Sequence, residues 1–81
     1  MPGRAAIKIR LDRVAQGNLG DHDSVGHGVV ELRIHRGPGY RVYIGLHGLE
    51  IVVLLCGGDK STQKQDVSAA HEYWEDYRRR S

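Results

Sequence analysis

The sequence predicts an α+β fold in which a three-stranded antiparallel meander has an N-terminal helix and a C-terminal helix packed on one face. Two segments with apolar residues at helical spacing flank a middle segment in which apolar and polar residues alternate. Alternation with a period of two is typical of strands that have one face in a core and the other in solvent. A chain of 81 residues has room for one modest core, so residues 1–81 are expected to form a single domain.

The first helix is expected over Ala5–Gln16, and Gly17 ends it. Its apolar residues recur at helical spacing while its basic residues fall mostly elsewhere, which is typical of an amphipathic helix. The segment that follows, 18–28, is rich in Gly, Asn, Asp, Ser and His, so it is predicted to be a loop. The apolar positions of the helix are Ile7, Leu11 and Val14.

Two strands are expected to form a hairpin around a turn at 37–39. In the segments 30–35 and 40–44 every second residue is apolar, which predicts strands with one apolar face. A period of two then places the intervening side chains together on the opposite face. The residues of this polar face are Glu31, Arg33, His35, Arg41 and Tyr43.

A third strand and a second helix complete the prediction. After a turn at 47–48, the run from Leu49 to Cys56 is almost continuously apolar, which favours a central strand covered on both faces. Gly57 and Gly58 are expected to break this strand, and a polar run then leads into a helix. The helix residues expected to cover the sheet are Val67, Ala70, His71, Trp74 and Tyr77.

Composition narrows the function classes. Twelve Lys and Arg against ten Asp and Glu give a net charge of +2, too small to indicate nucleic-acid binding unless the cations cluster. The one cysteine, Cys56, cannot form an internal disulfide. Because the sequence has no signal-peptide pattern and no apolar run long enough for a membrane span, a cytoplasmic protein without membrane contact is expected. The loop histidines His22, His27 and His47 lack metal-ligand spacing, so no metal and no cofactor are expected.

The polar face of the predicted hairpin gathers cations. Arg33 and Arg41 would lie on paired strands, where like charges are destabilising unless an anion such as a phosphate bridges them. Lys60 follows two flexible glycines and could reach the same face. Tyr43 and Tyr40 could stack on an unpaired base, as aromatic residues do when proteins hold single-stranded RNA. Taken alone, alternating charges are also the ordinary pattern of a solvated sheet face.

Two motifs carry a resemblance that covers most of the chain from Gly17 to Ala70. The stretch GNLGDHDSVGHGVVELRIHRGPGYRVYI, followed by IVVLLCGGDKSTQKQDVSAA, closely resembles the addiction-module killer proteins of the RelE/ParE toxin superfamily, including the HigB-like members. The resemblance implies a RelE-like fold and a toxin-antitoxin module in which a helix-turn-helix antitoxin neutralises the toxin. Many members of the superfamily cleave messenger RNA in the ribosomal A site.

By this resemblance, Arg33, Arg41 and Lys60 would surround the scissile phosphate. Cleavage needs a base for the 2′-hydroxyl proton, cations at the phosphate and an acid for the leaving oxygen. His35, Glu31 and Asp59 are the candidates for the base by their chemistry. The predicted catalytic residues are thus Arg33, Arg41, Lys60 and His35, and the predicted substrate-binding residues are Tyr43, Tyr40, Glu31 and Asp59.

Two other functions stay open on the sequence alone. ParE-like members of the superfamily poison DNA gyrase without cutting RNA. The segment Arg4–Gln16 matches only part of the family's first helix, so residues 1–81 are expected to lack the usual N-terminal strand. Loss of that strand would expose a sheet edge, which favours a homodimer or an inactive remnant that only binds antitoxin. The expected partners are a helix-turn-helix antitoxin, the ribosome with its mRNA, and a second copy of the chain.

Overall fold

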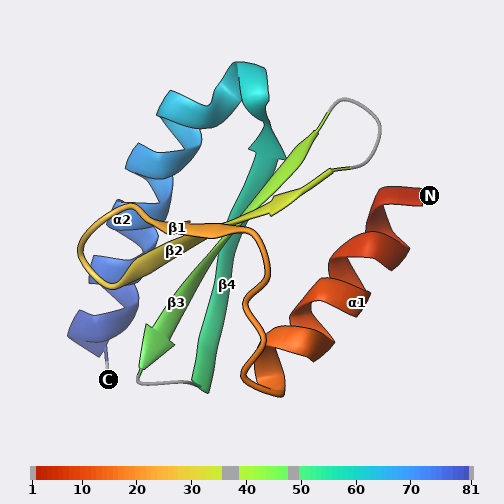
Figure 1. The fold of residues 1–81 in the computed structure, drawn as a ribbon. Helices are drawn as coiled ribbons and strands as arrows, with labels where there is room; N and C mark the ends of the chain where they lie inside the picture. Colours follow the sequence, from red (N-terminus) through yellow and green to blue (C-terminus); the bar gives the residue numbers. More distant parts are fainter. Residues whose placement is uncertain (1, 36–38, 48–49, 81) are drawn as a thin grey trace.

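A four-stranded antiparallel sheet lies between two helices in the computed structural model, which describes residues 2–35, 39–47 and 50–80 (Figure 1). The strands are arranged β1-β2-β3-β4, so each strand pairs with its neighbour in sequence. The α+β class predicted from the sequence is confirmed, whereas the sheet has four strands and not three. The elements are α1 (Pro2–Ala15), β1 (His22–Ser24), β2 (Val29–Ile34), β3 (Tyr40–His47), β4 (Glu50–Asp59), the 3-10 helix η1 (Lys60–Thr62) and α2 (Gln63–Arg80).

The additional strand, β1, lies in the segment 18–28 that the sequence predicts to be a loop. Its three residues are all exposed and polar, so they carry no alternation that could reveal a strand. β1 pairs with β2 in the register His22 with Leu32 and Ser24 with Val30. The N–H of Val25 donates to the carbonyl of Val29, and the N–H of Val29 donates to that of Gly26. These bonds close the connecting turn, in which Gly26, His27 and Gly28 have positive φ angles.

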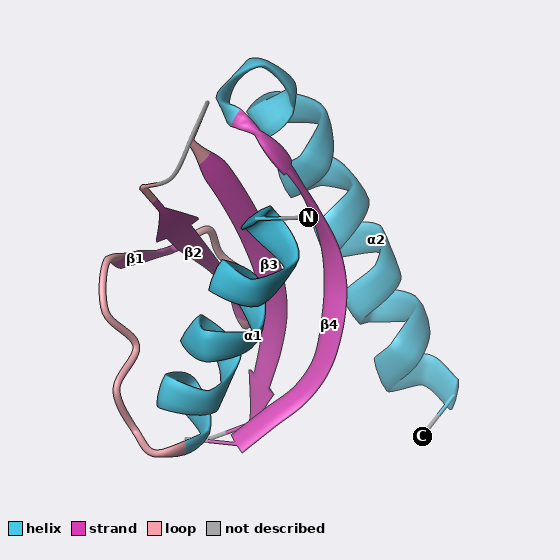
Figure 2. Cartoon of the chain, turned by 90° about the vertical axis from the view of Figure 1, so that its right-hand side faces the viewer, coloured by secondary structure: helices cyan, strands magenta, loops and turns pink. Residues whose placement is uncertain are grey.

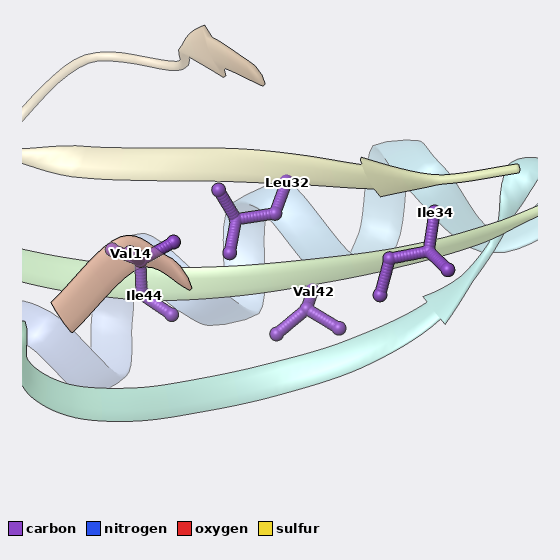
Figure 3. Close-up of a cluster of buried hydrophobic side chains, with 5 residues drawn as sticks. All are labelled: Val14, Leu32, Ile34, Val42 and Ile44. Carbon is purple, nitrogen blue, oxygen red and sulfur yellow. The ribbon is translucent and has the colours of Figure 1, made fainter. Parts of the chain in front are cut away.

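The two helices cover opposite faces of the sheet, which corrects the prediction that both pack on one face (Figure 2). On the α1 face, Val14 packs against apolar side chains of β2 and β3. On the α2 face, Ala70 and Trp74 pack against Val29 and Tyr43. The polar face of the predicted hairpin is therefore partly covered. The buried residues of the α1 cluster, shown in Figure 3, are Val14, Leu32, Ile34, Val42 and Ile44.

The strand β4 is an edge strand, which corrects the prediction of a central strand covered on both faces. Leu54 in it is half exposed. The strand also continues through Gly57 and Gly58 to Asp59, so the glycines do not break it. A Cβ at Gly58 would overlap the side chains of Thr62 and Asp66, so this position needs a glycine for close approach and not for a turn. Residues 37, 38 and 48 of the two predicted turns lie outside the described residues.

The end of α1 and most of the buried side of α2 agree with the sequence prediction. Gly17, with φ +88°, ends α1 by donating its N–H to the carbonyl of Val14, while Asn18 donates to Arg13, a Schellman arrangement. In α2, Ala70 and Trp74 are buried, as predicted for the side that covers the sheet. Tyr77 corrects that prediction, because it stacks on Trp74 and is 41% exposed. Within the described residues, neither helix is long and apolar enough to cross a membrane.

Candidate functional site

A cavity of about 220 Å³ lies at the end of the sheet where β2 ends and β3 begins. Five of its lining residues are ones that the sequence analysis singled out. Four are the predicted catalytic residues and the fifth is Tyr40. The cavity is lined by Arg33, Ile34, His35, Gly39, Tyr40, Arg41 and Lys60.

Strand pairing brings these residues together. Arg33 lies directly opposite Arg41 in the β2–β3 register, as the alternation pattern predicts. On its other side β3 pairs with β4, where Tyr40 lies opposite Asp59. Lys60, the residue after Asp59, therefore reaches the cavity because β4 pairs along the full length of β3, and not because the glycines let the chain fold back.

Asp59 holds the turn that carries Lys60. Its carboxylate accepts hydrogen bonds from the N–H of Ser61 at 2.8 Å and of Thr62 at 3.2 Å, which caps η1. The hydrogen bonds from Ser61 and Thr62 lower the pKa of Asp59. Asp59 is not among the residues that line the cavity. The geometry therefore gives Asp59 a capping function in place of the predicted contact with substrate.

The carboxylate of Glu31 lies at the centre of a buried polar cluster behind the cavity. Oε1 accepts from Arg41 Nη1 at 2.8 Å and from Arg33 Nη1 at 3.2 Å. Oε2 accepts from the Tyr43 hydroxyl at 2.9 Å and from Gln63 Nε2 at 3.0 Å. The residue is only 1% exposed, and four donors fill the accepting positions of its carboxylate. The anion that bridges the two arginines is thus Glu31.

Two predicted substrate contacts are corrected by this cluster. Glu31 is too deeply buried to touch a substrate directly. Tyr43 is fully buried under α2, so its ring cannot stack on a base. Burial, together with the Glu31 carboxylate, raises the pKa of Tyr43. Tyr40 lines the cavity and is partly exposed, while it also packs against the α1 cluster.

Asp21 orients both a cation and an imidazole at the rim of the site. Its Oδ1 accepts from Arg33 Nη2 at 2.9 Å, and its Oδ2 accepts from His35 Nε2 at 2.5 Å. These bonds from Arg33 and His35 lower the pKa of Asp21 to about 2. The Arg33 guanidinium also lies 3.5 Å from Asp23, so carboxylates surround it. With Nε2 donating to Asp21, neutral His35 has its free electron pair on Nδ1.

Arg10 of α1 fixes the segment that carries Asp21. Its guanidinium donates to the carbonyl oxygens of Leu19 at 2.9 Å and of Arg33 at 2.7 Å, and to that of Asp21. A Cβ at Gly20 would lie 2.8 Å from this guanidinium, so Gly20 leaves it room. Partial burial lowers the pKa of Arg10. Asp21, Arg10 and Gln63 were all missed from the sequence, because their roles depend on β1 and on the placement of the helices.

The arrangement combines a carboxylate-oriented imidazole with two cations. Lys60 is exposed, and the side chain of Arg41 is 15% exposed beside its bond to Glu31. An imidazole held by a carboxylate is suited to proton transfer, and adjacent cations stabilise negative charge that develops during a reaction. Arg33 is bound to three carboxylates and serves mainly to hold them. In the part of the chain that the structure describes, no group of three or more His, Cys, Asp or Glu could hold a metal ion.

Fold and site together define a small α+β protein whose meander lies between two helices and ends in a polar cavity with basic and imidazole side chains. A protein described as "Uncharacterized protein" from Haemophilus influenzae (strain ATCC 51907 / DSM 11121 / KW20 / Rd) is 51% identical to this chain over 67 residues. The match spans 83% of this chain and 68% of that protein. The chain belongs to the same family as this Haemophilus influenzae protein. No family model matches the chain, and no solved structure shows significant similarity to it.

Proposed function

We propose that the chain is the toxin of a type II toxin-antitoxin module, of the RelE/ParE superfamily and HigB-like, and that it cleaves messenger RNA on the ribosome. The observation that carries the proposal is the gathering of His35, Arg41 and Lys60 around one cavity. The motif resemblance of 17–70 to addiction-module killer proteins supports the same reading.

The proposed reaction is attack of a ribose 2′-oxygen on the adjacent phosphorus. His35 Nδ1 accepts the 2′-hydroxyl proton, and Asp21 stabilises the imidazolium that forms. The 5′-oxygen of the next nucleotide leaves and takes a proton from water, so the products are a 2′,3′-cyclic phosphate and a 5′-hydroxyl end. Arg41 and Lys60 stabilise the extra negative charge on the phosphate. Tyr40 stacks on a base beside the cleaved bond.

The proposed partners follow from this function. A helix-turn-helix antitoxin neutralises the toxin, and the ribosome presents the mRNA. A second copy of the chain pairs with the edge strand β4, in which the half-exposed Leu54 would be covered.

The function is tested with purified ribosomes programmed with a defined mRNA. His35→Ala is expected to lower the cleavage rate by about 10²–10⁴-fold, the usual loss when a general base is removed. His22→Ala is the matched control, because His22 is an exposed histidine on β1 outside the cavity. Inhibition of gyrase supercoiling without any cut mRNA would overturn the proposal in favour of a ParE-like toxin. Absence of both activities, and of growth arrest on expression, would indicate a remnant.

A further inference from the structure

A second and larger cavity, of about 620 Å³, lies between α2 and the turn that joins β1 to β2. Its volume falls within the roughly 300–1,000 Å³ that is usual for small-molecule sites. The strand β2 separates it from the candidate site, and its six residues span about 17 Å. The cavity is lined by His27, His71, Trp74, Glu75, Arg78 and Arg79.

Two imidazoles meet edge to face in this cavity. The ring centroids of His27 and His71 are 4.7 Å apart with planes at 69°. His71 is fixed because its Nε2 donates to the carbonyl of Val25 at 2.7 Å, which leaves Nδ1 for another partner. His27 has φ +58°, a conformation that few residues other than glycine adopt. The turn therefore holds an imidazole over α2 at some cost in backbone strain.

The charge of the lining favours an anion. The lining contains two arginines, Arg78 and Arg79, and one carboxylate, that of Glu75. Within residues 2–35, 39–47 and 50–80, Arg79 has no ion-pair partner, whereas its neighbour Arg80 is paired with Asp76 at 3.1 Å. Guanidinium groups bind phosphate with two parallel hydrogen bonds, and imidazole N–H groups can add to them.

We propose that this cavity is a binding site for a phosphorylated nucleotide, distinct from the RNA-cleaving site and independent of the proposed function. Arg79 binds the phosphate with help from His27. Glu75 accepts a hydrogen bond from a ribose hydroxyl or a base amino group. A phosphate joined to a nucleoside occurs both in a free nucleotide and at the phosphorylated end of an RNA strand. The experiment below distinguishes these two ligands.

Trp74 supplies a specific probe of this site. It is the one tryptophan of the sequence, so the indole N–H gives a single NMR signal. Its Nε1 lies 2.9 Å from where a Cβ of Gly28 would be, beside the turn that carries His27. The titrants are inorganic phosphate, adenosine monophosphate, adenosine and a short oligoribonucleotide with a 5′-phosphate. We expect saturable shifts with every titrant except adenosine.

Two matched variants decide the outcome. Arg79→Ala is expected to weaken adenosine monophosphate binding by about tenfold, as loss of a charge-assisted contact should, while Arg80→Ala changes it by less than about twofold. His27→Asn, which tolerates the backbone conformation of this position, is expected to weaken binding as well. Equal effects of Arg79→Ala and Arg80→Ala, equal binding of adenosine, or no saturation by ~10 mM would overturn the site. Tighter binding of the oligoribonucleotide than of the mononucleotide would identify RNA ends as the ligand, and the reverse order would identify free nucleotides.

Discussion

Replacement of Glu31 is the substitution that the structure predicts to be most destabilising outside the apolar core. Its carboxylate is 1% exposed and accepts hydrogen bonds from Arg33, Arg41, Tyr43 and Gln63. In Glu31→Ala, two guanidinium groups lose their shared anion and the buried Tyr43 hydroxyl loses its acceptor. Removal of one partner from a buried ion pair costs about 3–5 kcal/mol. A chain of 81 residues has a total stability of roughly 4–12 kcal/mol, so Glu31→Ala should remove a large fraction of the free energy of unfolding at 25 °C.

Graded variants separate the charge of Glu31 from its hydrogen bonds. Glu31→Gln retains the shape but removes the charge and places an amide N–H₂ against donors, so we expect a loss of about 2–3 kcal/mol. Tyr43→Phe removes one neutral donor and should cost about 1 kcal/mol. Asp76→Asn is the control, because the exposed pair of Asp76 with Arg80 contributes less than about 1 kcal/mol.

Urea unfolding followed by circular dichroism measures these losses. For a chain of this size the free energy of unfolding falls by about 1 kcal/mol per molar urea, so Glu31→Gln should lower the unfolding midpoint by about 2–3 M. If the free energy of unfolding of Glu31→Gln lies within about 0.5 kcal/mol of that of the wild type, the Glu31 cluster is not a major source of stability.

Three further predictions concern titrating groups. The pKa of Asp21 is lowered to about 2, so its contribution to stability is present above the unfolded pKa of about 4 and is lost as the pH falls toward 2. In Asp21→Asn the urea midpoint should depend less on pH between pH 5 and 2 than it does in the wild type. An equal dependence on pH in the two proteins would contradict the lowered pKa of Asp21. The pKa of Tyr43 is raised, so its contribution is present below the unfolded pKa of about 10 and is lost at higher pH. Ultraviolet titrations of wild type and Tyr43→Phe should coincide until alkaline unfolding begins, and a difference of one phenolate near pH 10 would refute this. Burial and Asp66 raise the pKa of Cys56, so the folded thiol should react with disulfide reagents more slowly than the unfolded thiol, and equal rates would refute this.

The strand pairing that builds the site could be predicted from sequence. Alternation over 30–44 fixes which side chains share a face, and a hairpin closed near Gly39 then places Arg33 opposite Arg41. The structure has this register. The catalytic residues predicted on the hairpin therefore gather as expected.

The burial of the polar face could not be predicted. Alternation shows on which face of the sheet a side chain lies, but it does not show which element covers that face. Trp74 lies so close to Gly45 that a Cβ there would overlap its ring. This close approach of α2 to β3 is what buries Tyr43 and encloses Glu31. The contact depends on the path of the chain through η1, which no local pattern specifies.

The strand β1 could not be predicted for a different reason. Its residues are polar and exposed, so the strand is formed by pairing with β2 and not by burial. Without β1, nothing in the sequence places Asp21 beside His35. The sequence therefore did not predict the pair of Asp21 and His35, because it did not predict β1.

We propose that the cavity at the end of β2 and β3 cleaves mRNA, and a pair of lysine variants provides the sharpest test. Lys60 lines the cavity, whereas Lys64 is an exposed lysine on α2 outside it. Single-turnover cleavage of ribosome-bound mRNA should fall by about 10²–10³-fold in Lys60→Ala and stay unchanged in Lys64→Ala. Equal cleavage rates in the two variants would contradict the claim.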